Sequence, residues 1–180
     1  MARIICVTGG ARSGKSRFAE SFYAQIDDVV YIATCQPSDD EMRARVALHR
    51  RSRPASWKTF EGSHDLDRAV STQKHYLLDC LSLLCSNIMF KLSRNDERIS
   101  PGRQQEIETL VLQELRRLIS AIRDIQGMLL IVTNEVGLSI VPEHHISRVY
   151  RDILGRVNQA VAALCDEVYL VVCGIPVKIK

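Results

Sequence analysis

The sequence predicts a three-layer α/β fold in which a mostly parallel β-sheet is flanked by helices. Two observations predict this fold. Short apolar runs rich in β-branched residues recur along the chain, and segments with helical spacing of apolar residues lie between them. Strands that alternate with helices form βαβ units with right-handed crossovers. We expect residues 1–180 to form a single domain, because 180 residues is the length of one ordinary domain.

Five runs have the length and composition of strands. Their near-continuous apolar character is typical of strands that are buried on both faces of a parallel sheet. They lie at residues 4–8, 29–33, 76–79, 128–133 and 168–173.

Two long segments are expected to form amphipathic helices. Apolar residues advance by three or four positions through 107, 111, 115, 118, 122 and 125, and again through 146, 149, 153, 157, 161 and 164. Ser100-Pro101 indicates the start of the first helix, Gly127 its end, and Pro142 the start of the second. The stretch at 93–103 has low hydrophobicity and is predicted to be a loop.

Composition argues against two classes of partner. The 24 Lys and Arg residues nearly balance the 21 Asp and Glu residues, so we expect no nucleic-acid partner and no stable membrane insertion. The first residues pass directly into a strand-like run without the features of a signal peptide, which indicates a cytoplasmic protein. Six scattered cysteines show no CxxC pair and no metal spacing, and we expect buried, reduced thiols.

Residues 9–16, GGARSGKS, match the phosphate-loop pattern G-x-x-x-x-G-K-[ST]. The match follows the apolar run IICVT and precedes the helix-forming stretch RFAE, so strand, loop and helix come in the required order. Glycines let backbone N–H groups turn toward an anion, and the helix N-terminus favours negative charge. The stretch predicts a P-loop NTPase fold, RecA-like, rather than a glycine-rich turn without a ligand. The predicted nucleotide contacts are Gly9, Gly10, Ala11, Arg12, Ser13, Gly14, Lys15 and Ser16.

Three residues are predicted to act at the nucleotide's phosphates. Lys15 would bridge the β and γ oxygens as a catalytic residue, and the Ser16 hydroxyl would bind Mg²⁺. Asp79, at the end of the third apolar run, would hold the same metal directly or through water, as the carboxylate of a neighbouring strand. The alternative for Asp79 is a helix cap or turn residue.

A basic segment at 39–61 surrounds a single histidine, His49. Such runs are often solvated helix faces. This one follows the second predicted strand, whose carboxyl end is expected to open onto the same edge as the phosphate loop. We therefore expect its arginines to reach a triphosphate; they are Arg43, Arg45, Arg50, Arg51 and Arg53.

Several motifs together resemble the bifunctional adenosylcobinamide kinase/adenosylcobinamide-phosphate guanylyltransferase family of cobalamin biosynthesis. The resemblance covers nearly the whole chain and is least diagnostic between residues 93 and 126. It is carried by GGARSGKSRFAE, YIAT, DDEM-x-x-R-[IV]-x-x-H, W-x-T-x-E, LLDCLSLL-x-SN, VTNEVG-x-x-IVP, YRD, GRVNQ and GIPVKIK.

The resemblance implies two reactions. The γ-phosphate of ATP or GTP passes to the hydroxyl of the aminopropanol arm of adenosylcobinamide. GTP then reacts at its α-phosphorus with a histidine and releases pyrophosphate, and the cobinamide phosphate takes up the GMP to give adenosylcobinamide-GDP. The matching histidine is His49, and nearby guanidinium groups favour the uncharged imidazole that attacks.

Further nucleotide contacts follow from the resemblance. They are Ala33, Thr34 and Cys35, then Arg50, Arg51, Ser52 and Arg53, and the carboxylates Glu61 and Asp79. Glu61 is alternatively an exposed strand or loop residue.

Asn134 and Glu135 follow the fourth apolar run, where either a substrate-orienting role or a loop cap is expected. His144 and His145 are interpreted as a surface or oligomer contact at the start of a helix.

Two rival functions remain open from the sequence. A plain P-loop small-molecule kinase would use the phosphate loop and Asp79 but not His49. A non-catalytic nucleotide switch is disfavoured, because the chain lacks the guanine-reading N-K-x-D element. A bulky corrinoid is expected to need a pocket between subunits, so we expect a homo-oligomer, with a trimer as one arrangement.

Overall fold

A seven-stranded sheet forms the centre of the computed structural model, which describes residues 1–35, 40, 44, 47, 54–93, 96 and 98–180. The strand order is β3-β2-β4-β5-β1-β6-β7, and every neighbouring pair is parallel except β6 and β7. The predicted mostly parallel sheet is therefore confirmed. The strands are β1 (Arg3–Gly9), β2 (Val29–Ala33), β3 (Lys58–Glu61), β4 (His75–Asp79), β5 (Met128–Val132), β6 (Glu167–Val172) and β7 (Ile175–Lys178).

All five predicted strands are present, each within one residue of the expected ends. The two strands that the pattern missed, β3 and β7, lie at the edges of the sheet. Each has only four residues, and most of their side chains are exposed. An edge strand of this kind lacks the continuous apolar run by which buried strands are recognised.

The helices are α1 (Lys15–Ser21), α3 (Leu81–Leu92), α4 (Pro101–Asp124) and α5 (His145–Leu164), with a 3₁₀ turn η1 (Leu66–Ala69). Ser100 caps α4 as expected, because its Oγ accepts a hydrogen bond from Arg103 N at 3.3 Å. The loop prediction was wrong for residues 101–103, which form the first turn of α4. Helix α5 begins at His145, three residues after Pro142. In the described part of the chain, no helix has the length and apolar character required to cross a bilayer.

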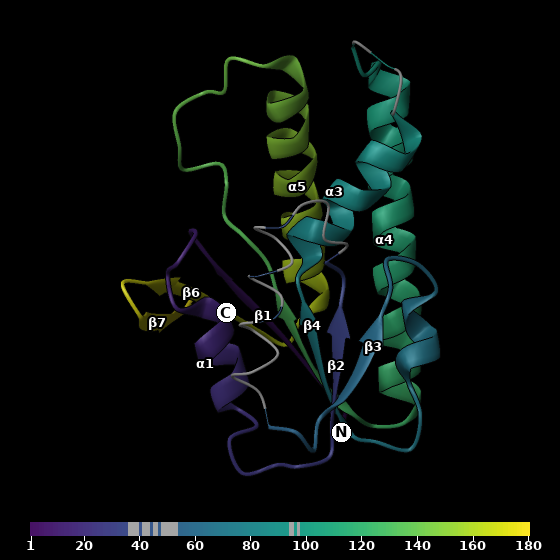
Figure 1. The fold of residues 1–180 in the computed structure, drawn as a ribbon, viewed down its shortest axis with the longest axis vertical. Coiled ribbons are helices and arrows are strands. Elements are labelled where there is room, and N and C mark those ends of the chain that lie inside the picture. The colour runs from purple at the N-terminus through teal and green to yellow at the C-terminus, as the bar shows by residue number, and fades with distance from the viewer. Residues whose placement is uncertain (36–39, 41–43, 45–46, 48–53, 94–95, 97) are drawn as a thin grey trace.

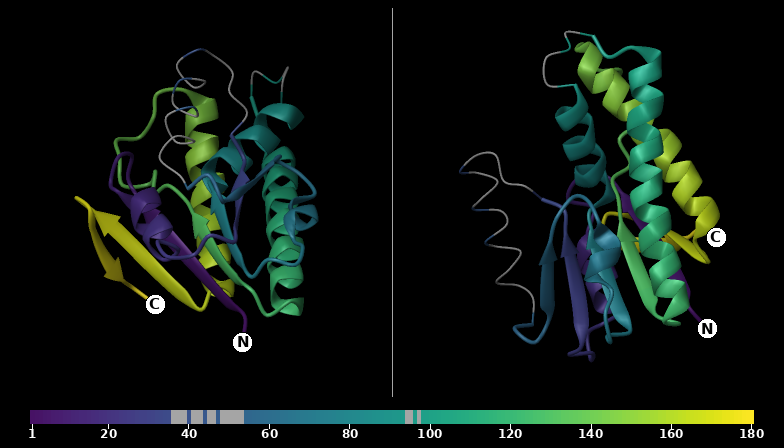
Figure 2. Two further views of the ribbon diagram at one scale, coloured as in Figure 1. Left: turned by 60° about the horizontal axis from the view of Figure 1, so that its bottom comes forward. Right: turned by 90° about the vertical axis from the view of Figure 1, so that its right-hand side faces the viewer.

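Helices cover both faces of the sheet (Figures 1 and 2). On one face, α3, α4 and α5 pack over the larger core, which includes Ile4 and Cys6 of β1. On the other face, α1 packs over a smaller core with Ile5 and Val7. Side chains alternate along a strand, so a strand covered on both faces needs apolar residues at successive positions.

One row of paired residues crosses the sheet near its carboxyl edge. Val7 pairs with Val132, Val132 with Asp79, Asp79 with Ala33, and Ala33 with Glu61. Paired residues in a sheet point to the same face, and Val7 and Val132 belong to the core beneath α1. Asp79 and Glu61 therefore lie on the face that α1 covers. Asp79 was expected on a strand next to the strand of the phosphate loop. In the structure, β5 lies between β1 and β4, the strand of Asp79.

Candidate functional site

The phosphate-loop motif spans the turn from the end of β1 to the start of α1, where the pattern predicts it. Ser13 N donates to Gly10 O at 3.3 Å, and Lys15 Nζ donates to the same carbonyl at 3.1 Å. Arg12 and Gly14 adopt positive φ angles of 57° and 93°. The loop is thus closed on itself, with the Lys15 ammonium group held against its backbone.

Two glycines of the loop are required by close packing against the β6–β7 hairpin. A Cβ on Gly9 would lie 2.5 Å from Val171 O, and one on Gly14 would lie 3.2 Å from Gly174 Cα. The hairpin turn, Cys173-Gly174, has φ angles of 52° and 81°, as in the type I′ turns that join antiparallel strands. Gly174 N donates to Ser13 O at 2.8 Å. The hairpin therefore buttresses the phosphate loop.

Asp79 lies at the carboxyl end of β4, and its carboxylate is held by Tyr31. The Tyr31 hydroxyl donates to Asp79 Oδ2 at 2.5 Å. Burial, and then the charge of Asp79, raise the pKa of the adjacent Cys80 thiol to about 11, and the charge of Lys15 opposes this shift. The charges of Asp79 and Lys15 thus both affect the pKa of Cys80. A raised pKa favours the protonated Cys80 thiol at neutral pH.

Thr34 joins the end of β2 to the residue that follows β4. Its side chain is completely buried, and Oγ1 both accepts from Cys80 N at 3.0 Å and donates to Cys80 O at 2.8 Å. Asn87 Nδ2 donates to Thr34 O at 2.7 Å. Thr34 has no exposed surface, and its neighbours Ala33 and Cys35 are half-buried. A nucleotide contact by these three residues stays a prediction.

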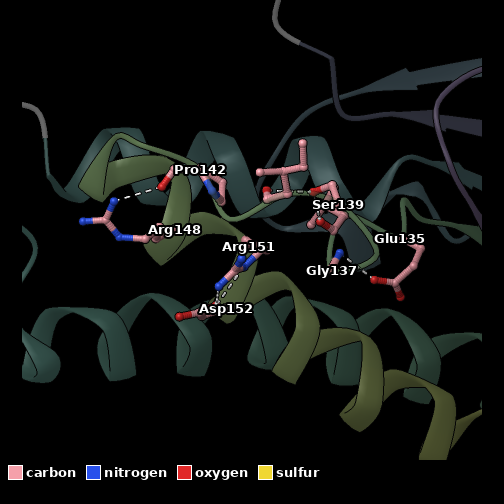
Figure 3. Close-up of polar contacts among 9 residues, drawn as sticks. Glu135, Gly137, Ser139, Pro142, Arg148, Arg151 and Asp152 are labelled. Carbon is pink, nitrogen blue, oxygen red and sulfur yellow. Dashed lines mark hydrogen bonds and ion pairs between the residues drawn. The ribbon is translucent and has the colours of Figure 1, made fainter.

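The segment after β5 is tied to the phosphate loop. Glu135 N donates to Gly9 O at 3.1 Å, and Glu135 Oε1 accepts from Gly137 N at 2.7 Å, the contact drawn in Figure 3. Asn134 Nδ2 donates to Ser82 Oγ at 2.5 Å. Glu135 thus caps the loop after β5, and Asn134 contacts the first turn of α3. A substrate-orienting role for either residue stays a prediction.

Polar contacts also fix the rest of the loop that leads to α5 (Figure 3). Ser139 Oγ donates to Val136 O at 3.0 Å, and Arg148 Nη1 donates to Pro142 O at 2.9 Å. His145 Nε2 accepts from Ile99 N at 3.3 Å, so this histidine joins α5 to the residues before α4. Three aliphatic side chains of the loop are strongly exposed: Leu138, Ile140 and Val141.

The remaining predicted site residues fall into two groups. Glu61 is exposed at the end of β3, four strands from β1, which corresponds to about 19 Å at about 4.8 Å per strand. The second group lies outside the described residues; it consists of His49, Arg50, Arg51, Ser52 and Arg53, together with Arg43 and Arg45.

The donor set fits a magnesium ion that is bound mainly by a nucleotide and water. Mg²⁺ keeps several waters and takes one or two protein oxygens besides substrate phosphates. Ser16 lies in the first turn of α1, and Asp79 lies on the face of the sheet that α1 covers. Within the described ranges, no group of three or more His, Cys, Asp and Glu side chains gathers into a metal cage.

Comparison with known proteins decides the family. The profile described as cobinamide kinase/cobinamide phosphate guanyltransferase (CobU) matches residues 5–179. The chain belongs to this family. It is 44% identical to the "bifunctional adenosylcobalamin biosynthesis protein CobU" of Escherichia coli K12, over 98% of this chain and 99% of that protein. It is 36% identical to the corresponding CobP protein of Pseudomonas aeruginosa, over 97% and 95%.

The P-loop NTPase fold is also confirmed. A solved ATPase from the type III secretion system of pathogenic bacteria aligns with a TM-score of 0.56 over 93% of this chain and 50% of that one. At 11% identity, this likeness shows the fold alone.

Sequence reasoning missed two supports of this site. In the sequence, Tyr31 resembles an ordinary core residue of an apolar strand. The residues before and after it do not indicate a hydrogen bond to Asp79. Gly174 carries a weak signal, because a glycine between two β-branched runs indicates a tight hairpin turn. Its contact with the phosphate loop joins residues 161 positions apart (174 minus 13), which no local pattern encodes.

Replacement of Gly9 by Ala is expected to destabilise the protein, whereas the same change at Gly10 is not. The Gly9 Cβ would meet a backbone carbonyl at 2.5 Å, but a Cβ on Gly10 would have no atom within 4 Å. Overpacking of this kind costs about 1–3 kcal/mol. Thermal unfolding followed by circular dichroism measures the difference. Equal melting temperatures for Gly9→Ala and Gly10→Ala would contradict the packing described above.

Proposed function

We propose that the protein phosphorylates adenosylcobinamide with ATP or GTP and then converts adenosylcobinamide phosphate to adenosylcobinamide-GDP with GTP. The observation that carries the proposal is the family match over residues 5–179, combined with a phosphate loop correctly placed between β1 and α1. Curated relatives named as bifunctional adenosylcobalamin biosynthesis proteins support it. We further propose that the protein works in the cytoplasm.

In the first reaction, a substrate hydroxyl oxygen attacks the γ-phosphorus. The bond from the γ-phosphorus to the β–γ bridging oxygen breaks, ADP or GDP leaves, and the hydroxyl proton is released. The backbone of residues 9–14 and the Lys15 ammonium would hold the phosphates in line with the attacking oxygen. Lys15 would also stabilise the negative charge that develops on the leaving nucleotide.

In the second reaction, an imidazole nitrogen of His49 attacks the α-phosphorus of GTP. The bond to the α–β bridging oxygen breaks, pyrophosphate leaves, and GMP remains on the histidine. A phosphate oxygen of adenosylcobinamide phosphate then attacks the same phosphorus and displaces the imidazole. Two displacements through a covalent intermediate replace one difficult transfer.

We propose that Mg²⁺ accompanies the nucleotide and that Ser16 and Asp79 hold it. When bound, the ion would supply positive charge that offsets the negative charge developing on the phosphate oxygens. The chain's own contribution would be the Ser16 hydroxyl in the first turn of α1 and the Asp79 carboxylate on the sheet face that α1 covers.

Lys15→Ala is expected to reduce ATP-dependent phosphorylation of adenosylcobinamide by about 100-fold or more, because it removes the cation that faces the phosphates. The readout is transfer of label from γ-³²P ATP to the corrinoid. Lys91→Ala, at an exposed lysine in the last turn of α3, is the control and should retain full activity. Undiminished turnover in Lys15→Ala would remove the phosphate loop from the reaction.

His49→Ala is expected to abolish covalent labelling of the protein by α-³²P GTP. In the wild type, the label on the denatured chain should be acid-labile and alkali-stable, as expected for a phosphoramidate. His64→Ala changes an exposed histidine outside the site and should label normally. Label that persists in His49→Ala would refute the covalent step, and a plain kinase would then be favoured.

We propose that the protein forms a homo-oligomer, with a trimer as one arrangement. Val172 pairs with Ile175 and Leu170 with Val177, so their side chains share one face of the β6–β7 hairpin. Four aliphatic residues on this face are at least half exposed, and such apolar patches mark interaction surfaces. They are Val172, Ile175, Val177 and Ile179.

Val177→Asp is expected to shift the assembly toward the 20.3 kDa monomer, because it places a charge in the centre of that patch. Light scattering coupled to size-exclusion chromatography gives the mass. Leu110→Asp, at an exposed leucine of α4, should leave the mass of the assembly unchanged. A wild-type protein that runs as a monomer, or a Val177→Asp variant with unaltered mass, would overturn this interface.

A further inference from the structure

Tyr31 places a polar group at the carboxyl edge of the sheet from within the core. Its side chain is 2% exposed and packs in the core beneath α1. It pairs in register with Leu77, two residues before Asp79, so all three side chains point to the same face. Its hydroxyl donates a hydrogen bond to Asp79 Oδ2 at 2.5 Å.

Two other tyrosines of the described chain are equally buried, but they bond differently. The Tyr23 hydroxyl donates to the backbone carbonyls of Tyr76 and Met128, at the amino ends of β4 and β5. The Tyr76 hydroxyl accepts from Ser71 N and donates to Gln73 O. These hydroxyls satisfy backbone groups near the amino ends of the strands, whereas Tyr31 engages an ionisable side chain at the carboxyl edge of the sheet, where the phosphate loop also lies.

A hydrogen bond from a ring fixed in the core restricts rotation of the Asp79 carboxylate. It holds Oδ2 in place and thereby sets the direction of Oδ1. Phenylalanine would fill the same core volume, so the hydroxyl is not required for packing. Groups that orient a metal-binding side chain affect the metal affinity, often by 10-fold to 100-fold.

We propose that Tyr31 is a positioning residue, which orients the Asp79 carboxylate toward the magnesium ion of the bound nucleotide. The inference rests on the proposed magnesium role of Asp79 and extends it. Tyr31 contacts neither nucleotide nor metal, and it acts through Asp79.

The test measures nucleotide binding rather than turnover. The β,γ-imido analogue of GTP is titrated into the purified full-length protein by isothermal calorimetry, once with saturating Mg²⁺ and once with EDTA. The dissociation constant in EDTA divided by the constant in Mg²⁺ gives the gain in affinity that the metal confers. We expect Tyr31→Phe to reduce this ratio by about 10-fold. The dissociation constant in EDTA should stay unchanged, because the phosphate loop is intact.

Tyr23→Phe is the matched control, since it deletes a hydroxyl from an equally buried tyrosine at the other end of the strands. It should keep the wild-type ratio. A double-mutant cycle with Asp79→Asn tests the route of action. If Tyr31 acts through Asp79, Tyr31→Phe has no further effect on the ratio in the Asp79→Asn background.

The possible failures are distinguishable. A wild-type ratio in Tyr31→Phe overturns the inference and leaves the magnesium role of Asp79 standing. Equal loss of affinity with and without Mg²⁺ also overturns it, because a merely structural hydroxyl behaves in that way. A wild-type protein whose affinity does not depend on Mg²⁺ overturns the metal role itself, while the labelling of His49 tests guanylyl transfer independently.

Discussion

The register of the parallel strands places the candidate site. Val7, Val132, Asp79 and Ala33 lie in one row, so β5, β4 and β2 end at the same level, and β1 continues to Gly9 at the same edge of the sheet. Because side chains alternate along a strand, a shift of β4 by one residue would turn Asp79 to the opposite face. The relative position of the phosphate loop and Asp79 thus depends on the register in which β1, β5 and β4 pair.

The two faces of the sheet contribute differently to this edge. The face under α1 carries the groups with proposed chemistry, Lys15 and Asp79. The opposite side holds the same edge in place through polar contacts, in which Thr34 bonds to the backbone of Cys80 and Asn134 bonds to Ser82. The Tyr31 hydroxyl therefore holds the Asp79 side chain, and the hydrogen bonds of Thr34 hold the backbone of the next residue, Cys80. Such support restricts the carboxylate more than the strand alone can.

How far the sequence predicts this structure depends on the range of the interaction involved. The phosphate loop and the start of α4 were predictable, because Gly9–Ser16 and Ser100-Pro101 encode local backbone geometry. The buried strands were predictable from their apolar runs. Contacts between distant segments were not: the bond from Tyr31 to Asp79 spans 48 positions and looks in the sequence like an ordinary core tyrosine. The hydrogen bonds of Thr34 were not predictable for the same reason, since its partner Cys80 lies after another strand, at the start of α3.

The phosphate loop also depends on the last residues of the chain. Strand β1 lies between β5 and β6, so the N-terminal strand is completed only by segments near the C-terminus. Gly174 then donates to Ser13 O, and the hairpin backbone lies so close to Gly9 that no side chain fits there. Contacts of such long sequence separation carry a larger loop-closure entropy cost than local contacts do. Although GGARSGKS is a local motif, its binding conformation is a property of the nearly complete fold.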